Sequence, residues 1–179
     1  MKSVLRLGAA GLLAVLLGAI LSPGSAWTQV ANLAGSYHLD DPMAMQNIRK
    51  AVDKVADRMG FLIAPIAHDR LMDANQPAQQ IVISTVGNAV TVQFDQDQPI
   101  TGPADGSTID WTRDDGEKVR VTTVWQGATL QRAVAGKQAT RTVTFTLDGG
   151  GNILTVQIQI VSSRLPLPVA YPLTYRRNG

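Results

Sequence analysis

From Gln79 onward the chain alternates apolar and polar residues with a period of two, as strands with one buried face do. Short links containing Gly, Asn or Asp interrupt the alternation, and such links join antiparallel neighbours. The pattern predicts strands at residues 80–86, 89–95, 107–113, 117–125, 128–134, 138–147, 153–161 and 169–176, with a very short strand around Ile100.

The segment before Gln79 contains a further strand and two helices. Residues 32–39 alternate in the same way and predict the first strand. Asp41 and Pro42 are typical of a helix start, and Gly60 of a helix end. Apolar residues recur between them at three- and four-residue steps, from Met45 to Met59, which predicts an amphipathic helix. A second, shorter helix is expected to begin near Pro65, and either plugs one end of the core or forms a lid over a cavity.

Nine or ten strands in a hairpin meander favour a closed sheet. Twist accumulates in a long sheet, and unpaired edges invite aggregation. The predicted fold is therefore mainly β, an antiparallel up-and-down meander that closes into a barrel, with a helix pair between the first and second strands. A two-sheet sandwich fits the same pattern, but every link is hairpin-like and no long crossover is visible.

The N-terminal residues have the features of a secretory signal peptide. Lys2 and Arg6 precede an apolar run over residues 7–21, and small residues follow up to Ala26. The competing reading is a retained anchor, but the run is shorter than the roughly 20 residues that a spanning helix needs. The prediction is a signal peptide at 1–26, a single domain at 27–179, and a periplasmic or secreted protein.

Charge and composition exclude several classes of function. The chain has 16 Lys and Arg against 14 Asp and Glu. Loss of Lys2 and Arg6 with the signal peptide leaves 14 basic residues, so the mature domain lacks the basic footprint of a nucleic-acid binder. Without cysteine there is no disulfide and no thiolate metal site. The two histidines, His38 and His68, have no partners at ligand spacing, and no nucleophile or cofactor motif is present, so we expect no enzyme, no metal and no cofactor.

The order of the predicted elements carries a resemblance to known proteins. A first strand with Gly35-Ser36-Tyr37, a helix pair and a hairpin meander that ends at Tyr175-Arg176 resemble the calycin group. Within that group the chain is most similar to the fatty-acid-binding-protein and lipocalin families, over roughly Leu33 to Arg177. These families usually carry Gly-x-Trp and Arg-x-Tyr, whereas here tyrosine replaces the tryptophan, and adjacent Tyr175 and Arg176 point to opposite faces. The resemblance implies a barrel that holds a small hydrophobic ligand.

Alternation also predicts which polar side chains face inward. Arg141 shares the apolar face of its strand, as does Arg132, and a buried arginine requires an acceptor from the protein or a ligand. The alternative is that both reach past the rim of the barrel into solvent. The candidate site has three parts: Arg132, Arg141, Tyr171 and Tyr175 for an anionic head group, Trp111 and Trp125 as cavity wall, and Phe61 and Ile63 from the helix pair.

Three functional hypotheses follow from this pattern, of which the weakest is a hydrolase or isomerase that would use Arg141 and His68 in the cavity. The first is an exported binding protein that holds a small hydrophobic, anionic molecule, such as a fatty acid or another lipid, inside the barrel. It allows transient membrane contact through the helix pair and has no nucleic-acid partner. The alternative is a non-enzymatic interaction or structural module of the cell envelope with a packed barrel interior.

Overall fold

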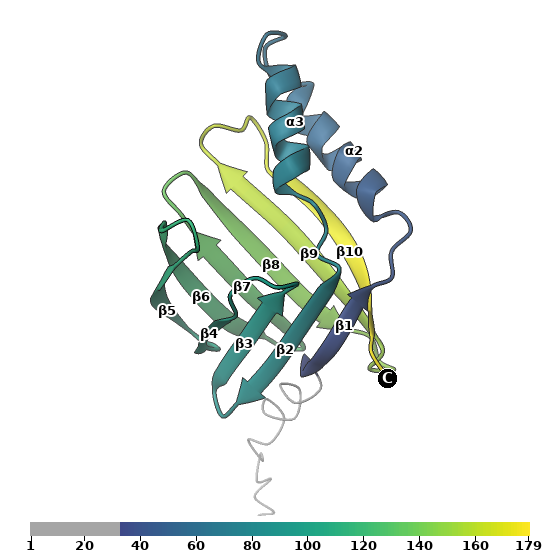
Figure 1. Ribbon diagram of the computed structural model, residues 1–179, viewed down its shortest axis with the longest axis vertical. Coiled ribbons are helices and arrows are strands. Elements are labelled where there is room, and N and C mark those ends of the chain that lie inside the picture. Colours follow the sequence, from purple (N-terminus) through teal and green to yellow (C-terminus); the bar gives the residue numbers. More distant parts are fainter. Residues whose placement is uncertain (1–32) are drawn as a thin grey trace, which may run out of the picture.

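The computed structural model describes residues 33–179, so the predicted signal peptide at 1–26 lies outside the described residues. Figure 1 shows a curved sheet with two helices at one end. The elements, in chain order, are β1 (Gly35–Leu39), α2 (Ala44–Ala56), α3 (Ala64–Ala74), β2 (Gln80–Val86), β3 (Ala89–Phe94), β4 (Ile100–Pro103), β5 (Asp105–Thr112), β6 (Lys118–Gln126), β7 (Thr129–Ala135), β8 (Ala139–Leu147), β9 (Ile153–Ser162) and β10 (Val169–Arg177).

All ten strands belong to one antiparallel sheet in the order β4-β3-β2-β1-β10-β9-β8-β7-β6-β5. β1 pairs with both β2 and β10, and so joins the early strands to the end of the chain. The sheet curls until β4 and β5 meet, and β4 also packs against β6. The predicted meander, its barrel closure and the helix pair between the first two strands are confirmed, and the sandwich alternative is wrong because a single ladder includes every strand.

Hairpin turns set the register through residues that suit tight turns. Gly87 between β2 and β3, and Gly127 between β6 and β7, have φ of 57° and 60°, where a side chain is strained. After β8, the carboxylate of Asp148 accepts hydrogen bonds from the backbone nitrogens of Asn152 and Ile153, both at 2.8 Å. The bond from Ile153 is the largest cause of a lowered pKa of Asp148. These bonds start β9 at a defined position.

Helix α2 lies along β10 and contributes its apolar face to the core. Ile48, Val52 and Val55 are fully buried on that face. The helix begins at Ala44, two residues after Pro42, with Met43 as its N-cap residue and no side-chain cap. One carboxylate oxygen of Asp41 accepts from the backbone nitrogen of Met43 and the other from that of Thr174 in β10. It ends at Ala56 instead of Met59, since Met59 donates to the Ala56 carbonyl in a tighter turn. Neither helix of the described chain is long and apolar enough to cross a bilayer.

The barrel end opposite the helices is closed around Tyr37. This side chain is fully buried, and its hydroxyl donates to the Leu33 carbonyl at 2.9 Å. The guanidinium of Arg177 lies 5.0 Å from the Tyr37 ring centroid and donates to its hydroxyl at 2.7 Å. Arg177 also donates to the carbonyls of Ala34 and Gly151. A cation stacked on an aromatic ring and bonded to backbone on two sides closes this end of the barrel.

Candidate functional site

The register of the ladder places both predicted arginines on the inner face. Arg141 lies between Val134 of β7 and Ile160 of β9, and Arg132 lies opposite Val143 of β8. All are on the face that carries the buried aliphatic side chains. The two arginines are diagonal neighbours on adjacent strands, with Arg141 one layer nearer the helix end.

Arg132 lies in the centre of the barrel, and each of its three side-chain nitrogens has an acceptor from the protein. Its side chain is 2% exposed, so it does not reach past the rim into solvent. Nε donates to the Thr123 hydroxyl at 2.9 Å, Nη1 to the Ile100 carbonyl at 2.8 Å and Nη2 to the Val90 carbonyl at 2.9 Å. Burial without a carboxylate lowers the pKa of Arg132 to about 10. Its donors connect β7 to β6, β4 and β3.

Arg141 is different, because the protein leaves one of its donors without an acceptor. Nε is buried and has no hydrogen-bond partner among the described residues. The positive charge lies close enough to Tyr171 and Tyr175 to oppose the rise of their pKa values. A half-buried guanidinium with a free donor among apolar side chains attracts an anion such as a carboxylate.

The hydroxyls of Tyr171 and Tyr175 face inward but already have acceptors. Tyr171 donates to the side-chain oxygen of Asn75 at 2.8 Å, and Tyr175 donates to the Ala78 carbonyl at 3.0 Å. Burial is the largest cause of the raised pKa of both hydroxyls. They therefore hold the segment after α3 against β10, and a ligand carboxylate would have to displace Asn75 to use the Tyr171 hydroxyl.

Asn75 and Thr123 are buried polar residues that the sequence reasoning missed. Asn75 follows α3, donates from Nδ2 to the Leu71 carbonyl at 2.7 Å and accepts from Tyr171. In the sequence it belongs to an Asn-Gln-Pro break that reads as an ordinary turn. Thr123 accepts from Arg132, and the only signal for it was a polar residue on the apolar face of β6.

The two tryptophans lie at opposite ends of the barrel. Trp111 pairs with Val119 next to the β5–β6 turn, at the helix end. Trp125 pairs with Leu130 next to the β6–β7 turn, and its Nε1 is buried without a hydrogen-bond partner among the described residues. Of the two, Trp111 shares the end of the barrel that contains Arg141.

Phe61 and Ile63 are not inside the barrel. They lie in the turn between α2 and α3 and are 84% and 60% exposed. Leu62 and Ile66 beside them are also exposed. Figure 1 shows this turn beyond the end of the barrel, away from the sheet. The structure therefore separates these apolar residues from the arginines.

The interior is packed in its centre and more accessible at the helix end. Leu130, Phe145 and Val156 face inward and retain no accessible surface, whereas a side chain beside a water-sized hollow would retain some. At the helix end five inner-face residues are only half-buried, whereas Val119, Val169 and Tyr171 at the same end are buried; the five are Ile109, Trp111, Val134, Arg141 and Ile160. These five residues define the mouth of the barrel, the name used below.

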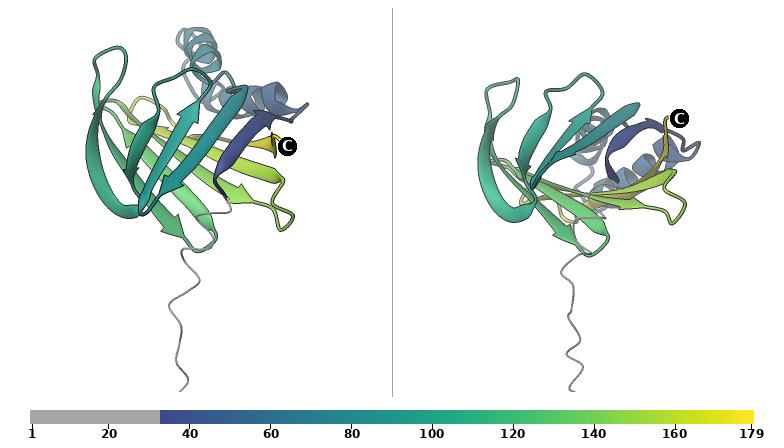
Figure 2. Two further views of the ribbon diagram at one scale, coloured as in Figure 1. Left: turned by 60° about the horizontal axis from the view of Figure 1, so that its bottom comes forward. Right: turned by 90° about the horizontal axis from the view of Figure 1, so that it is seen from below.

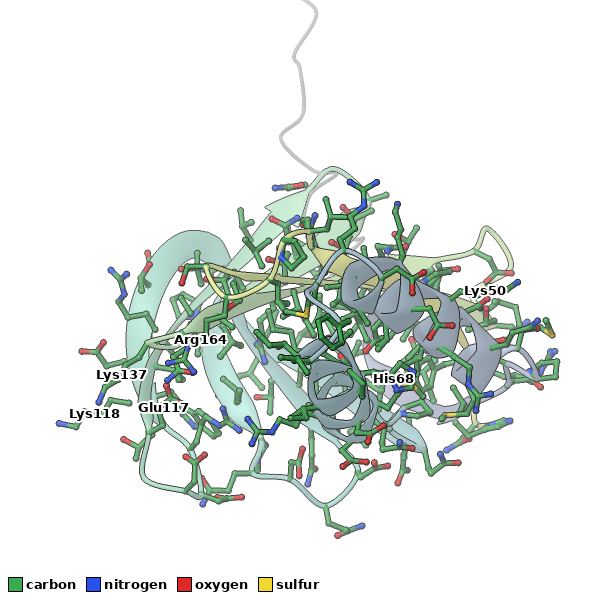
Figure 3. All side chains as sticks on the ribbon, turned by 90° about the horizontal axis from the view of Figure 1, so that it is seen from above. Lys50, His68, Glu117, Lys118, Lys137 and Arg164 are labelled. Atoms are coloured by element: carbon green, nitrogen blue, oxygen red, sulfur yellow. The ribbon has the colours of Figure 1, made fainter. Side chains whose placement is uncertain are left out.

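A separate surface hollow lies at the ends of β5, β6 and β7. It has a volume of about 270 Å³ and its lining includes Asp110, Lys118, Arg120 and Lys137. Figure 3 shows Lys118 and Lys137 at the periphery of the molecule, pointing away from the barrel. This hollow is thus on the outer surface and separate from the mouth.

The described residues contain no group of three or more His, Cys, Asp or Glu that could hold a metal ion. His68 of α3 lies between Asp53 of α2 and Asp69, at 3.1 and 3.3 Å, and Figure 3 shows it over the helix pair. His38 contacts the side-chain oxygen of Asn178 at 2.7 Å. Both histidines thus have structural partners.

Comparison with solved structures identifies the fold. A fatty-acid-binding protein of Echinococcus granulosus superposes with a TM-score of 0.56, at 10% identity, over 83% of this chain and 99% of that chain. The chain has the calycin fold. Lipid binding protein 8 of Caenorhabditis elegans gives 0.53 at 11% identity, over 83% of this chain and 96% of the other. The fatty acid transporter REP1-NXSQ gives 0.51 at 18% identity, over 83% and 98%. No family model and no curated protein matches the sequence.

Proposed function

We propose that this calycin-fold protein is an exported, non-enzymatic carrier of a small hydrophobic anion, with a fatty acid as the leading class of ligand. The ligand enters at the mouth, its carboxylate pairs with Arg141, and its chain extends among the inner-face side chains. Structural neighbours named for fatty-acid binding or transport support this ligand class. The predicted signal peptide at 1–26 supports export to the periplasm or beyond.

One observation carries the proposal: Arg141 faces inward with a buried Nε that no described residue accepts from. A buried donor without an acceptor costs about 1 to 3 kcal/mol, so a fold that keeps one stores free energy for a molecule that supplies the acceptor. Val134 and Ile160, its neighbours on the two adjacent strands, offer contacts to an alkyl chain. A carboxylate with an apolar tail matches both features.

Ligand identity is tested on protein purified from its own host. Native mass spectrometry followed by organic extraction should find a co-purifying carboxylate lipid. A delipidated sample should then bind a fluorescent fatty acid, which oleate displaces. The proposal fails if nothing co-purifies and neither the fluorescent probe nor oleate binds.

A packed interaction module is the second candidate, and the filled centre of the barrel favours it. If the protein is a carrier, room for the alkyl chain must come from movement of side chains such as Phe145 or from separation of strands. The two functions differ in one observable: fatty acid should raise the melting temperature of a carrier and leave that of a packed module unchanged.

The exposed turn between α2 and α3 supports transient membrane contact. Phe61, Leu62 and Ile63 form an apolar tip that is continuous with Ile66. Replacing Phe61 and Ile63 together by Ser should reduce binding to phosphatidylcholine–phosphatidylglycerol vesicles in a flotation assay. Val86→Ser is the matched control, because Val86 is an equally exposed apolar residue at the β2–β3 turn. Equal flotation of both variants would contradict the membrane contact.

A further inference from the structure

The line between β4 and β5 is closed by side chains instead of a backbone ladder. These strands are the two ends of the sheet order, and Ala104 joins them at the corner opposite the helices. There the backbone nitrogen of Ala104 donates to the backbone carbonyl of Asn88. The backbone nitrogen of Trp125 donates to the Ala104 carbonyl at 3.3 Å. The pairing of β5 with β6 then shifts between Asp105 and Thr108, and Figure 2 shows β5 curving away from β4 toward its turn with β6. We call this line the seam.

Two contacts hold the seam above that corner. The first is Ile109 of β5, which packs on the bare backbone of Gly102 in β4 so closely that a Cβ there would lie 3.1 Å from Ile109 Cδ1. The second is the guanidinium of Arg132, which crosses the interior to the carbonyls of Ile100 in β4 and Val90 in β3. The Arg132 contacts tie the β3–β4 edge to β7 on the other side of the seam.

Arg132 binds these carbonyls as a cation that has only neutral acceptors. A carboxylate carries a full negative charge and can take both Nη donors at once in a bidentate pair, whereas the two carbonyls are neutral. An anion that reaches the centre of the barrel would therefore displace Ile100 and Val90 from the guanidinium. Arg141 lies one layer toward the mouth, so the ligand carboxylate that pairs with Arg141 on entry can pass from there to Arg132.

We propose that the seam is a lateral gate of the barrel and that Arg132 is its latch. An anion inside the barrel takes over the guanidinium, releases the β3–β4 edge and lets the seam open. The ligand-driven part rests on the proposed carrier function; the latch itself does not. The gate also explains how a centre lined by fully buried side chains can make room for an alkyl chain.

The test is amide hydrogen exchange, measured by mass spectrometry on the full chain. Arg132→Lys keeps the charge but cannot span two carbonyls, and Gly102→Ala displaces Ile109 without touching Arg132. Both should speed exchange in β4 and in the upper half of β5 by about tenfold, while β8 and β9 stay protected. Arg120→Lys, on the outer face of β6, is the matched control and should leave every strand as in the wild type.

The outcomes separate the latch from the carrier function. Unchanged exchange in β4 and β5 of both variants, or an equal rise in β8 and β9, overturns the latch. If Arg132→Lys fails to fold, Gly102→Ala decides alone. Oleate added to the wild type should also speed exchange in β4 and β5. Oleate that binds without this effect overturns ligand-driven opening, whereas oleate that does not bind refutes the carrier function and leaves the latch to the variants.

Discussion

The centre of the barrel and its mouth each contain one inward arginine, and the protein treats the two differently. Arg132 in the centre has three acceptors from three strands. Arg141 at the mouth has a buried Nε with no acceptor among the described residues. Both residues follow from the same alternation in sequence, so the difference arises from what lies opposite each of them in the closed barrel.

This contrast assigns opposite roles to two chemically identical groups. A cation bonded through all three of its side-chain nitrogens in the centre fixes the approach of β3 and β4 to β6 and β7. An unsaturated cation at an accessible end binds whatever supplies an acceptor. If the protein supplied acceptors to both arginines, no inward donor would remain for a ligand. If it supplied acceptors to neither, no side chain in the centre would connect β3 and β4 to β7.

The largest effect is expected from Arg132→Met. Hydrogen bonds from a charged donor contribute about 1.5 to 3 kcal/mol each, and three are lost. Burial lowers the pKa of Arg132 to about 10, which corresponds to a burial cost of about 3 kcal/mol that the substitution removes. The bonds outweigh that cost, so the free energy of unfolding should fall by about 3 kcal/mol in urea denaturation.

Arg120→Met is the control for that measurement. Arg120 lies on the outer face of β6 opposite Asp110 and is exposed, so its loss should change stability by less than about 0.5 kcal/mol. If Arg132→Met is as stable as this control, the burial cost of the charge cancels the contribution of the three hydrogen bonds. Arg132 would then not stabilise the approach of the strands it connects.

Arg141→Met should separate binding from stability. The affinity for oleate should fall about tenfold or more, because a charge-assisted contact to the carboxylate is lost. Stability should stay within about 1 kcal/mol of the wild type or rise, since a buried donor without an acceptor disappears. Calorimetric titration and urea denaturation check the two parts. Unchanged affinity, or a loss of stability as large as for Arg132→Met, contradicts the contrast between the two arginines.

Sequence alone predicted the sheet well because each strand records its buried face in a local period of two. The inner positions of Arg132, Arg141, Tyr171 and Tyr175 followed from that period and are confirmed by the register. Helix ends were less accurate: Asp41, read as a cap, bonds to Thr174, which is 133 residues away in the chain. A local pattern contains no information about such a partner.

The partners of the inward polar groups could not be read from sequence for the same reason. Arg132 bonds backbone carbonyls 32 and 42 residues away, and Tyr171 bonds Asn75 across 96 residues. Backbone carbonyls have no residue-specific signature at all. Whether each arginine connects strands or binds a ligand therefore depends on which residues meet when the barrel closes. The sequence predicts that the sheet closes but not which residues then lie opposite each arginine.

Tyr171→Phe tests how much the buried hydrogen bond from Tyr171 to Asn75 contributes to stability. The substitution leaves the buried side-chain oxygen of Asn75 without its donor and should cost about 1 to 2 kcal/mol. The end of α3 should also lose protection in hydrogen exchange, because this bond joins Asn75 to β10. Tyr175→Phe is the comparison, as its hydroxyl bonds a backbone carbonyl at the half-buried Ala78 and should cost less. Equal losses would mean that burial of the acceptor does not decide the effect.

The smallest effect is expected on the free energy of unfolding above pH 10. There the titration of the tyrosines lowers stability and that of Arg132 raises it. Burial raises the pKa of Tyr37, Tyr171 and Tyr175 above the ordinary value of 10.0. Their contribution to stability is complete below pH 10 and is lost as the pH rises through the folded-state pKa values. Because the pKa of Arg132 is lowered to about 10, loss of its proton above about pH 10 relieves part of its burial cost and offsets part of that loss.

Stability should therefore decline only slowly just above pH 10, and tyrosinate absorbance should increase together with loss of the sheet signal in circular dichroism. In Arg132→Met the offset is absent, so the decline should be steeper over the same interval. Tyrosinate that forms near pH 10 in a protein with an intact sheet would show that the three hydroxyls are accessible. The centre of the barrel would then be as open as its mouth.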